Sequence, residues 1–259
     1  MTDSFLLVPH WPSMPKGVAA LSTTRRGGVS LGPYGDGKGG GGFNLGLHSG
    51  DDVEAVRENR AHLRHVLPGD PAWISQVHGA EVADAAKVAS GEPARADASV
   101  TTERGVVSAI LTADCLPVVL ADSKGAVVGT AHAGWRGLAA GVLGETVRVM
   151  RERGAGDIVA WMGPAIGPQQ FEVGQDVVDA FMDAGLGAAD EVRRCFVAHP
   201  ANAGKYLANI YALARIALAR DGVNDVTGGL HCTFTERDTF YSYRRDHVTG
   251  RQATLAWLR

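Results

Sequence analysis

Residues 105–137 read GVVSAILTADCLPVVLADSKGAVVGTAHAGWRG, and this stretch decides the fold. It holds three short apolar runs, at 106–111, 117–121 and 127–131, each bounded by turn or polar residues as strands are. Only a short turn, with Asp-Ser-Lys-Gly at 122–125, separates the second run from the third. This connection is too short for a helical crossover. The stretch therefore predicts antiparallel pairing and an α+β fold instead of strict strand–helix alternation.

The rest of the chain adds helices and further strands around this stretch. Apolar residues recur every three or four positions at 53–66, 138–150, 176–184 and 207–219, which predicts helices there. Short apolar or alternating runs predict strands at 17–23 and 158–162. Because the chain has no internal repeat and no long polar linker, we expect one domain over residues 1–259.

Composition excludes several classes of protein. The chain has 45% hydrophobic and 20% charged residues, typical of a soluble globular protein and unlike a disordered or fibrous one. A net charge of -3 argues against a nucleic-acid partner, and no apolar run approaches the roughly 20 residues of a membrane span. The start, MTDSFLLVPHWP, lacks the features of a signal peptide, and the three cysteines suit reduced thiols. We therefore expect a cytoplasmic protein.

Three potential soft-metal ligands lie next to predicted strands. The strand ending at residue 111 leads to Cys115, and the strand ending at residue 131 leads directly to His132, so pairing of these two strands would bring both side chains to one sheet edge. His78, in SQVHGAEV, would join them from a loop. Two imidazoles and one thiolate suit zinc, and three ligands leave the fourth position that a catalytic site needs.

Spacing alone leaves other interpretations open. A single Cys after a strand is commonly a small buried hydrophobe, and a His beside Gly is commonly a turn or cap residue. The separations, 37 residues from His78 to Cys115 and 17 from Cys115 to His132, match no compact ligand signature. An equally open interpretation is a metal-free site, with a thiolate and with imidazoles as general acids or bases.

The sequence blocks around these residues resemble a known family. It was once described as multicopper polyphenol oxidases or laccases, and is now understood as purine nucleoside phosphorylases with adenosine deaminase activity and, in some bacteria, peptidoglycan editing factors. The matching blocks are STTRRGGVS at 22–30, FNLGLHSGDD at 43–52, ENR at 58–60, QVHG at 76–79, TADCLPV at 112–118, AHAGWRG at 131–137, GPAIGPQQFEVG at 163–174 and CTFTERDTFYSYRRDHVTGRQA at 232–253.

The resemblance implies an α+β sandwich of mixed β-sheets flanked by α-helices. It also implies that His78, Cys115 and His132 form the family's metal and catalytic cluster, usually with zinc. On this basis we predict an enzyme that uses phosphate to convert adenosine, inosine and methylthioadenosine to base and ribose 1-phosphate, with adenosine deaminase activity at the zinc site. Its partners would be small molecules, not nucleic acid or membrane, and the chain would be a monomer or weak oligomer.

Three further residues are candidates for substrate binding. Arg25 and Asn44 fall in blocks that resemble active-site lining, and the Arg25 guanidinium suits bidentate binding of phosphate. A salt bridge for Arg25 and a turn for Asn44 are the structural alternatives. Gln76 lies two residues before His78, so both would point to one face of an extended segment.

The sequence leaves two alternative functions open. A copper-dependent polyphenol oxidase needs His-X-His pairs, which the nine histidines do not form, although copper can occupy such a site in vitro. A role as peptidoglycan editing factor acting on muropeptide precursors rests on resemblance alone.

The sequence also departs from the family pattern. The stretch GDGKGGGG at 35–42 looks like an insertion, and Asn209 stands where the family commonly has an acid. No glutamate follows His78 or His132 as in the His-X-Glu shuttle of zinc deaminases.

Overall fold

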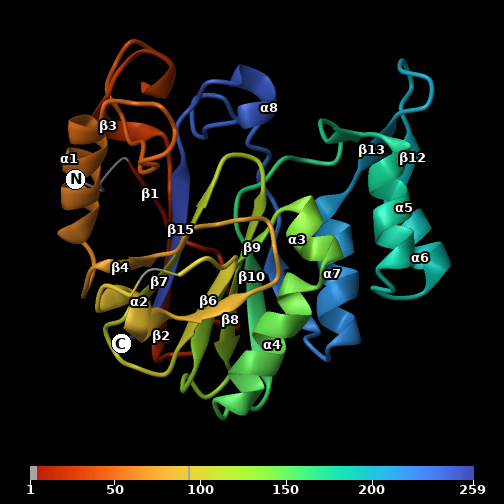
Figure 1. The fold of residues 1–259 in the computed structure, drawn as a ribbon, viewed down its shortest axis with the longest axis horizontal. Coiled ribbons are helices and arrows are strands. Elements are labelled where there is room, and N and C mark those ends of the chain that lie inside the picture. Colours follow the sequence, from red (N-terminus) through yellow and green to blue (C-terminus); the bar gives the residue numbers. More distant parts are fainter. Residues whose placement is uncertain (1–4, 93) are drawn as a thin grey trace.

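Two large β-sheets face each other in the computed structural model, which describes residues 5–92 and 94–259 (Figure 1). The first sheet has the order β1 (Leu6–Leu7), β2 (Val18–Thr23), β15 (Gln252–Leu258), β7 (Val107–Thr112), β4 (Pro71–Trp73). The second has the order β14 (Asp225–Gly228), β10 (Ile158–Met162), β8 (Leu116–Asp122), β9 (Val128–Ala133), β6 (Ala98–Thr101), β5 (Val82–Asp84). Both sheets mix parallel and antiparallel pairs.

Helices and a small third sheet surround the sandwich. The third sheet has the order β11 (Glu172–Val173), β13 (Tyr206–Ala208), β12 (Phe196–Ala198), and β3 (Arg26–Ser30) is separate. The helices are α1 (Val53–Arg64), α2 (Ala85–Ala89), α3 (Trp135–Ala139), α4 (Val142–Glu152), α5 (Gln175–Asp183), α6 (Ala189–Arg193), α7 (Ile210–Arg220) and α8 (Tyr243–Asp246), with one 3-10 turn at Gly32–Tyr34. The predicted α+β sandwich flanked by helices is confirmed.

Apolar side chains fill the layers on both sides of the second sheet. Between the sheets, Val119 and Trp161 pack with Ala256. On the outer face, α4 packs against β9, β6 and β5, with α3 and α7 beside it, and the fully buried Leu120 and Leu143 belong to this largest core (Figure 1). Because burial of apolar surface is the main force that holds such layers together, the sandwich is a stiff frame for the loops at its ends.

Two helix predictions need correction. The segment 138–150 is not one helix, because Gly141 has a φ of 92° and separates α3 from α4. The segment 207–219 begins as strand β13, and α7 starts only after Asn209, whose side chain accepts a hydrogen bond from the Ala212 amide at 3.0 Å. Asn209 therefore has a clear role as the N-cap of α7. No helix in residues 5–92 and 94–259 has the length and apolar character needed to span a membrane.

One predicted strand pairing is also wrong. The strand before Cys115, β7, does not pair with β9, because β7 lies in the first sheet and β9 in the second. It is β8, directly after Cys115, that pairs antiparallel with β9, placing Leu116 opposite Ala133 and Pro117 opposite His132. The chain therefore crosses from one sheet to the other at the segment that carries Cys115.

Candidate active site

The three predicted ligands meet where β8 begins and β9 ends. The Pro117–His132 pair places Cys115 beside the end of β9, and the loop after β4 brings His78 to the same place. The Sγ atom of Cys115 lies 3.9 Å from Nε2 of His78, and one ligand atom from each of the three residues lies within 4.8 Å of the others. His132 is buried, Cys115 is partly buried and His78 is exposed, so the cluster opens to solvent on the His78 side.

A fully buried carboxylate, Asp97, holds two of these ligands. Its Oδ1 lies 2.8 Å from Nδ1 of His132 and accepts the His78 amide at 2.9 Å. Its Oδ2 accepts the amides of Val77 at 3.1 Å and Gly79 at 2.7 Å. Because Asp97 engages Nδ1 of His132, the Nε2 atom of that ring is left for the cluster, as for metal-binding histidines oriented by a carboxylate.

The same carboxylate stabilises an unfavourable backbone conformation at His78. This residue has a φ of 61°, in the left-handed region that a non-glycine residue rarely adopts. Three successive amides that converge on one carboxylate form an anion-binding nest, which offsets the cost of that conformation. Asp97 therefore fixes both the position of His78 and the ring orientation of His132.

The cluster favours a charged thiolate. Burial opposes ionisation of Cys115, but the adjacent His132 and the hydrogen bond with His78 lower the pKa of the thiol to about 6. Burial also opposes protonation of His132, yet Cys115 and Asp97 raise the pKa of that imidazole to about 9. A thiolate is the form of cysteine that binds metal ions and attacks electrophiles. A metal ion would compete with the proton on His132, because ligands bind in their deprotonated form.

The donor set fits a three-ligand metal site. Two imidazole nitrogens and a thiolate converge, and the buried Asp97 holds one imidazole from behind. Zinc accepts this combination and leaves a fourth position open when only three protein ligands bind. Within residues 5–92 and 94–259 this is the one group of three or more His, Cys, Asp or Glu side chains arranged to hold a metal ion.

Two glycines of the AHAGWRG block keep space free at the cluster. A Cβ at Gly134 would lie 3.0 Å from the Cys115 Sγ and 3.3 Å from Nε2 of His132. A Cβ at Gly137 would lie 2.8 Å from the Gly79 carbonyl oxygen. The spacing of these glycines therefore has a steric reason that is tied to the site.

Replacing Gly134 by alanine should disturb the cluster without unfolding the protein. Gly134 has a φ of -59°, which alanine adopts without strain, so the added methyl acts only through its contacts with the ligands. We expect metal affinity and turnover to fall about tenfold or more, since displacements below 1 Å are costly at a reacting centre. Metal titration and thermal unfolding of the variant test this, and an alanine variant with unchanged metal affinity would contradict it.

The residue before Cys115 links this loop to the C-terminal part of the chain. Asp114 has a φ of 92° and is buried. Its carboxylate accepts the Thr233 hydroxyl at 2.6 Å and the Arg244 amide at 2.7 Å. Its carbonyl oxygen accepts the Ile166 amide at 2.9 Å. These bonds fix the direction in which the chain enters Cys115.

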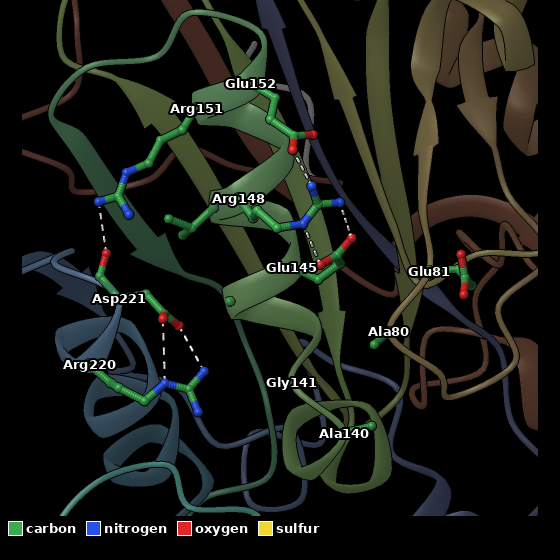
Figure 2. Close-up of a pocket in the computed structure, with 12 residues that line it drawn as sticks. Ala80, Glu81, Ala140, Gly141, Glu145, Arg148, Arg151, Glu152, Arg220 and Asp221 are labelled. Atoms are coloured by element: carbon green, nitrogen blue, oxygen red, sulfur yellow. Dashed lines mark hydrogen bonds and ion pairs between the residues drawn. The ribbon is translucent and has the colours of Figure 1, made fainter.

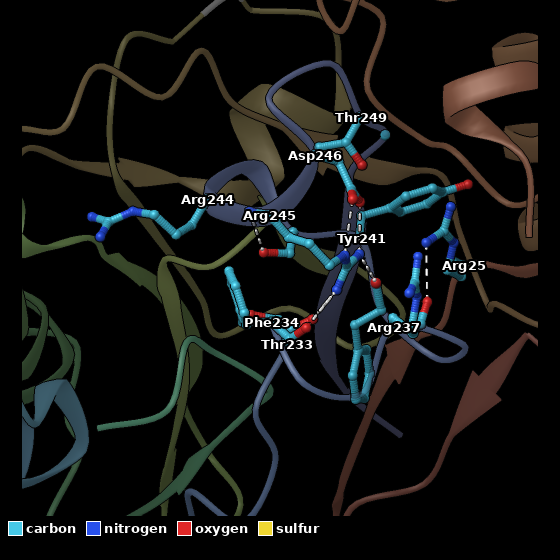
Figure 3. Close-up of polar contacts among 12 residues, drawn as sticks. Arg25, Thr233, Phe234, Arg237, Tyr241, Arg244, Arg245, Asp246 and Thr249 are labelled. Atoms are coloured by element: carbon cyan, nitrogen blue, oxygen red, sulfur yellow. Dashed lines mark hydrogen bonds and ion pairs between the residues drawn. The ribbon is translucent and has the colours of Figure 1, made fainter. Parts of the chain in front are cut away.

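Arg25 is buried and is bonded to main-chain oxygens. Its guanidinium donates to the Gly35 carbonyl through Nε at 3.0 Å and Nη2 at 2.7 Å, and to the Arg237 carbonyl through Nη1 at 3.0 Å. It also lies 4.9 Å from the centroid of the Tyr241 ring, as Figure 3 shows. Two of its five N–H groups have no partner among residues 5–92 and 94–259.

Asn44 and Gln76 are also bonded within the protein. Asn44 is fully buried, and its side-chain amide donates to Ser49 at 2.8 Å and Asp51 at 2.9 Å while its oxygen accepts the Arg251 amide at 2.8 Å. The half-buried Gln76 side chain exchanges two hydrogen bonds with the main chain of Leu111, at 2.8 and 2.9 Å. Gln76 thereby ties the His78 segment to the end of β7.

A hollow of the described surface is lined by none of the three ligands. This groove of about 780 Å³ lies along α4 and is lined mainly by charged side chains that pair with one another (Figure 2). Arg148 pairs with Glu145 and Glu152, and Arg220 pairs with Asp221. Since none of the three ligands lines it, we assign the groove no role in the chemistry.

Sequence reasoning missed the two aspartates that organise the site. Asp97 comes directly before the buried strand β6, and Asp114 comes directly before Cys115. A charged residue at the border of an otherwise apolar strand is the one signal that could have identified them, because a buried carboxylate requires partners.

Comparisons with known proteins place the chain in a family. A family model described as multi-copper polyphenol oxidoreductase laccase matches residues 19–259. The Escherichia coli K12 protein named purine nucleoside phosphorylase YfiH is 50% identical over 262 residues, covering 98% of this chain and 99% of the relative. A Pseudomonas aeruginosa protein named purine nucleoside phosphorylase PA4543 is 48% identical, covering 97% of this chain and 98% of the relative.

A solved structure has the same fold. The crystal structure of the Neisseria meningitidis protein NMB0706, assigned to the family model DUF152, superposes with a TM-score of 0.88. It is 46% identical in sequence, and the match covers 98% of this chain and 99% of that one. The agreement therefore extends over the whole sandwich and the loops that carry the cluster.

Proposed function

The chain belongs to the family described as multi-copper polyphenol oxidoreductase laccase, and on that premise we propose that it is a purine nucleoside phosphorylase. The substrates would be adenosine, inosine and methylthioadenosine together with phosphate. The observation that carries the proposal is the cluster of His78, Cys115 and His132, together with relatives of about 50% identity that bear the phosphorylase name.

The cluster supports this proposal better than it supports copper-dependent phenol oxidation. A multicopper oxidase uses many histidines for its trinuclear centre, whereas the described residues offer one group of three ligands. Copper binds more tightly than zinc to most sites of this kind, so copper added in vitro would bind here too. We regard oxidation of phenols by such a copper-loaded protein as a side reaction.

We propose zinc as the resident metal, held by Nε2 of His78, Sγ of Cys115 and Nε2 of His132. When bound, zinc supplies Lewis acidity beside the open position. The chain's own contribution is to keep the three ligands in place, through Asp97 for the two histidines and through Asp114 for the segment of Cys115.

In phosphorolysis, a phosphate oxygen forms a bond to C1′ of the ribose while the bond from C1′ to the purine nitrogen breaks. The base leaves with the electron pair of that bond and takes up a proton. The protein accelerates such a displacement by holding phosphate and nucleoside in line and by stabilising charge as it develops. We propose that Arg25, Asn44 and Gln76 line the substrate side of the site.

Adenosine deaminase activity is the second reaction in the proposal. It would replace the 6-amino group of adenosine by oxygen from water and release the amino group as ammonia, at the same cluster. Neither His78 nor His132 is followed by the glutamate that zinc deaminases use as proton shuttle, so another group would have to carry the proton. The proposal also includes a cytoplasmic location and a monomer or weak oligomer.

Product analysis tests the proposed function. The protein, with its metal content measured, is incubated with adenosine with and without inorganic phosphate, and the products are separated by chromatography. We expect adenine only when phosphate is present, and inosine in either condition. Absence of both products from folded, zinc-loaded protein would contradict the proposal and favour the peptidoglycan editing alternative.

Metal removal gives a second test. We expect about one zinc per chain, and loss of deamination after treatment with a chelator, because zinc deaminases depend on the metal for the attacking water. Adding zinc back should restore the activity. Deamination that survives in protein shown to be free of metal would contradict the zinc assignment.

A further inference from the structure

Arg251 lies at the edge of the candidate active site, although no sequence pattern singled it out. It directly precedes β15, whose first residue, Gln252, pairs with Thr112 at the end of β7. Thr112 is three residues from Cys115, so the backbone of Arg251 runs beside the segment that leads into the cluster.

The FNLGLHSGDD block holds the backbone and the stem of Arg251. The Arg251 amide donates to the Asn44 side chain at 2.8 Å, and its carbonyl accepts the Leu45 amide at 3.0 Å. A Cβ at Gly46 would lie 2.8 Å from Cγ of Arg251 and 3.1 Å from its Cβ, so only glycine leaves room for this stem. The buried Asn44 therefore acts on Arg251, and the block serves to position a guanidinium.

One edge of the Arg251 guanidinium is free of hydrogen-bond partners within the described residues. Nη1 donates to the carbonyls of Thr249 and Gly250, both at 2.9 Å. Nε and Nη2 have no partner in the part of the chain that the structure describes. These two atoms form the side of the guanidinium that donates two parallel hydrogen bonds to an oxyanion such as phosphate.

Arg251 is a partly buried cation close to the segment that carries Cys115. The residue is half-buried, and burial lowers the pKa of its guanidinium, while the negative charges of Cys115 and Asp114 raise it. Its three unused N–H groups stay available as hydrogen-bond donors to a ligand. In Arg25, by contrast, Nε and Nη2 both donate to Gly35.

We propose that Arg251 binds the phosphate substrate through Nε and Nη2 and holds it beside the cluster. This assignment rests on the proposed phosphorylase function and names the residue that recognises the second substrate. Arg25, whose Nε and Nη2 both donate to Gly35, would then hold the loop at 35–42.

The test compares Arg251→Gln and Arg251→Lys with a matched control, Arg60→Gln. Arg60 is also half-buried and also holds the 43–46 segment, donating to the Leu45 carbonyl at 2.9 Å, but it lies over the Trp73 ring. A variant that only loosens this segment should behave like Arg60→Gln. Loss of a charged, bidentate contact should instead weaken phosphate binding about 10- to 100-fold.

Two measurements distinguish loss of the phosphate contact from a general loosening of this segment. Calorimetric titration of zinc-loaded protein with inorganic phosphate should show binding to wild type and Arg60→Gln, weaker binding to Arg251→Lys and the weakest to Arg251→Gln. In phosphorolysis, Arg251→Gln should raise KM for phosphate by the same factor and change KM for adenosine less than about twofold.

The outcomes separate this inference from the proposed function. Equal phosphate affinity in wild type and Arg251→Gln, or no phosphate binding to wild type, would overturn the role of Arg251. Wild type that binds phosphate through Arg251 but releases no base would leave the anion site standing and contradict the phosphorylase proposal.

Discussion

Replacing Cys115 by alanine should reduce turnover of adenosine to background while the protein stays folded. Sγ of Cys115 is one of three ligand atoms within 4.8 Å of one another, and its neighbours keep it in the thiolate form. Alanine removes that ligand, and two histidines alone do not complete a zinc site. Steady-state rates, zinc content and circular dichroism measure the effect.

The stability cost of this change should be small, because it removes one partly buried sulfur, and we expect about 1 kcal/mol. Cys195→Ala is the matched control: this thiol is buried in the core and donates to the Glu191 carbonyl at 3.4 Å, away from the cluster. We expect the Cys195 variant to keep full activity. Full activity in folded Cys115→Ala would contradict the assignment of Cys115.

Replacing Asp97 by asparagine should damage both the site and the fold. The two carboxylate oxygens accept three amides and the His132 ring, and an asparagine NH₂ group in either position would face two of these donors. Leaving buried donors unpaired costs about 3 kcal/mol or more in unfolding free energy. Loss of the carboxylate behind a metal-binding histidine lowers metal affinity about 10- to 100-fold.

Asp122→Asn provides the control for Asp97→Asn. Asp122 is also buried and also accepts main-chain amides, from Ala126 at 3.1 Å and Gly156 at 2.9 Å, but it lies at the opposite end of β8 from Cys115. Unfolding experiments should show that both variants are destabilised, and zinc titration should show weaker binding only for Asp97→Asn. Equal loss of zinc affinity in both would mean that Asp97 acts through stability alone.

The sequence predicts the local part of this fold well. The short turn at 122–125 specifies the antiparallel β8–β9 pair, and that pair alone accounts for the meeting of Cys115 and His132. The partner of β7 could not be predicted, because its apolar run suits either sheet and only the tertiary packing selects β15 and β4. The sequence therefore predicted correctly that Cys115 and His132 meet, but it assigned the pairing with β9 to β7 instead of β8.

The candidate site is less predictable, because the contacts that organise it join residues far apart in the sequence. Asp97 reaches His78 and His132 from 19 and 35 residues away, and no periodicity signals such a contact. The family resemblance drew attention to Asn44 and Arg25 as members of blocks, but it did not specify their atoms' partners. Only coordinates show that Asn44 bonds the Arg251 amide.

The central claim is that phosphate attacks the nucleoside at this cluster, and phosphorus NMR tests it most directly. Zinc-loaded protein is mixed with adenosine and inorganic phosphate, and the phosphate resonance is followed alongside the Cys115→Ala variant. We predict that wild type converts the phosphate signal into that of ribose 1-phosphate in step with adenine release, whereas Cys115→Ala leaves it unchanged. An unchanged phosphate signal with folded, zinc-loaded wild type would contradict the claim. Equal formation of ribose 1-phosphate by Cys115→Ala would also contradict it.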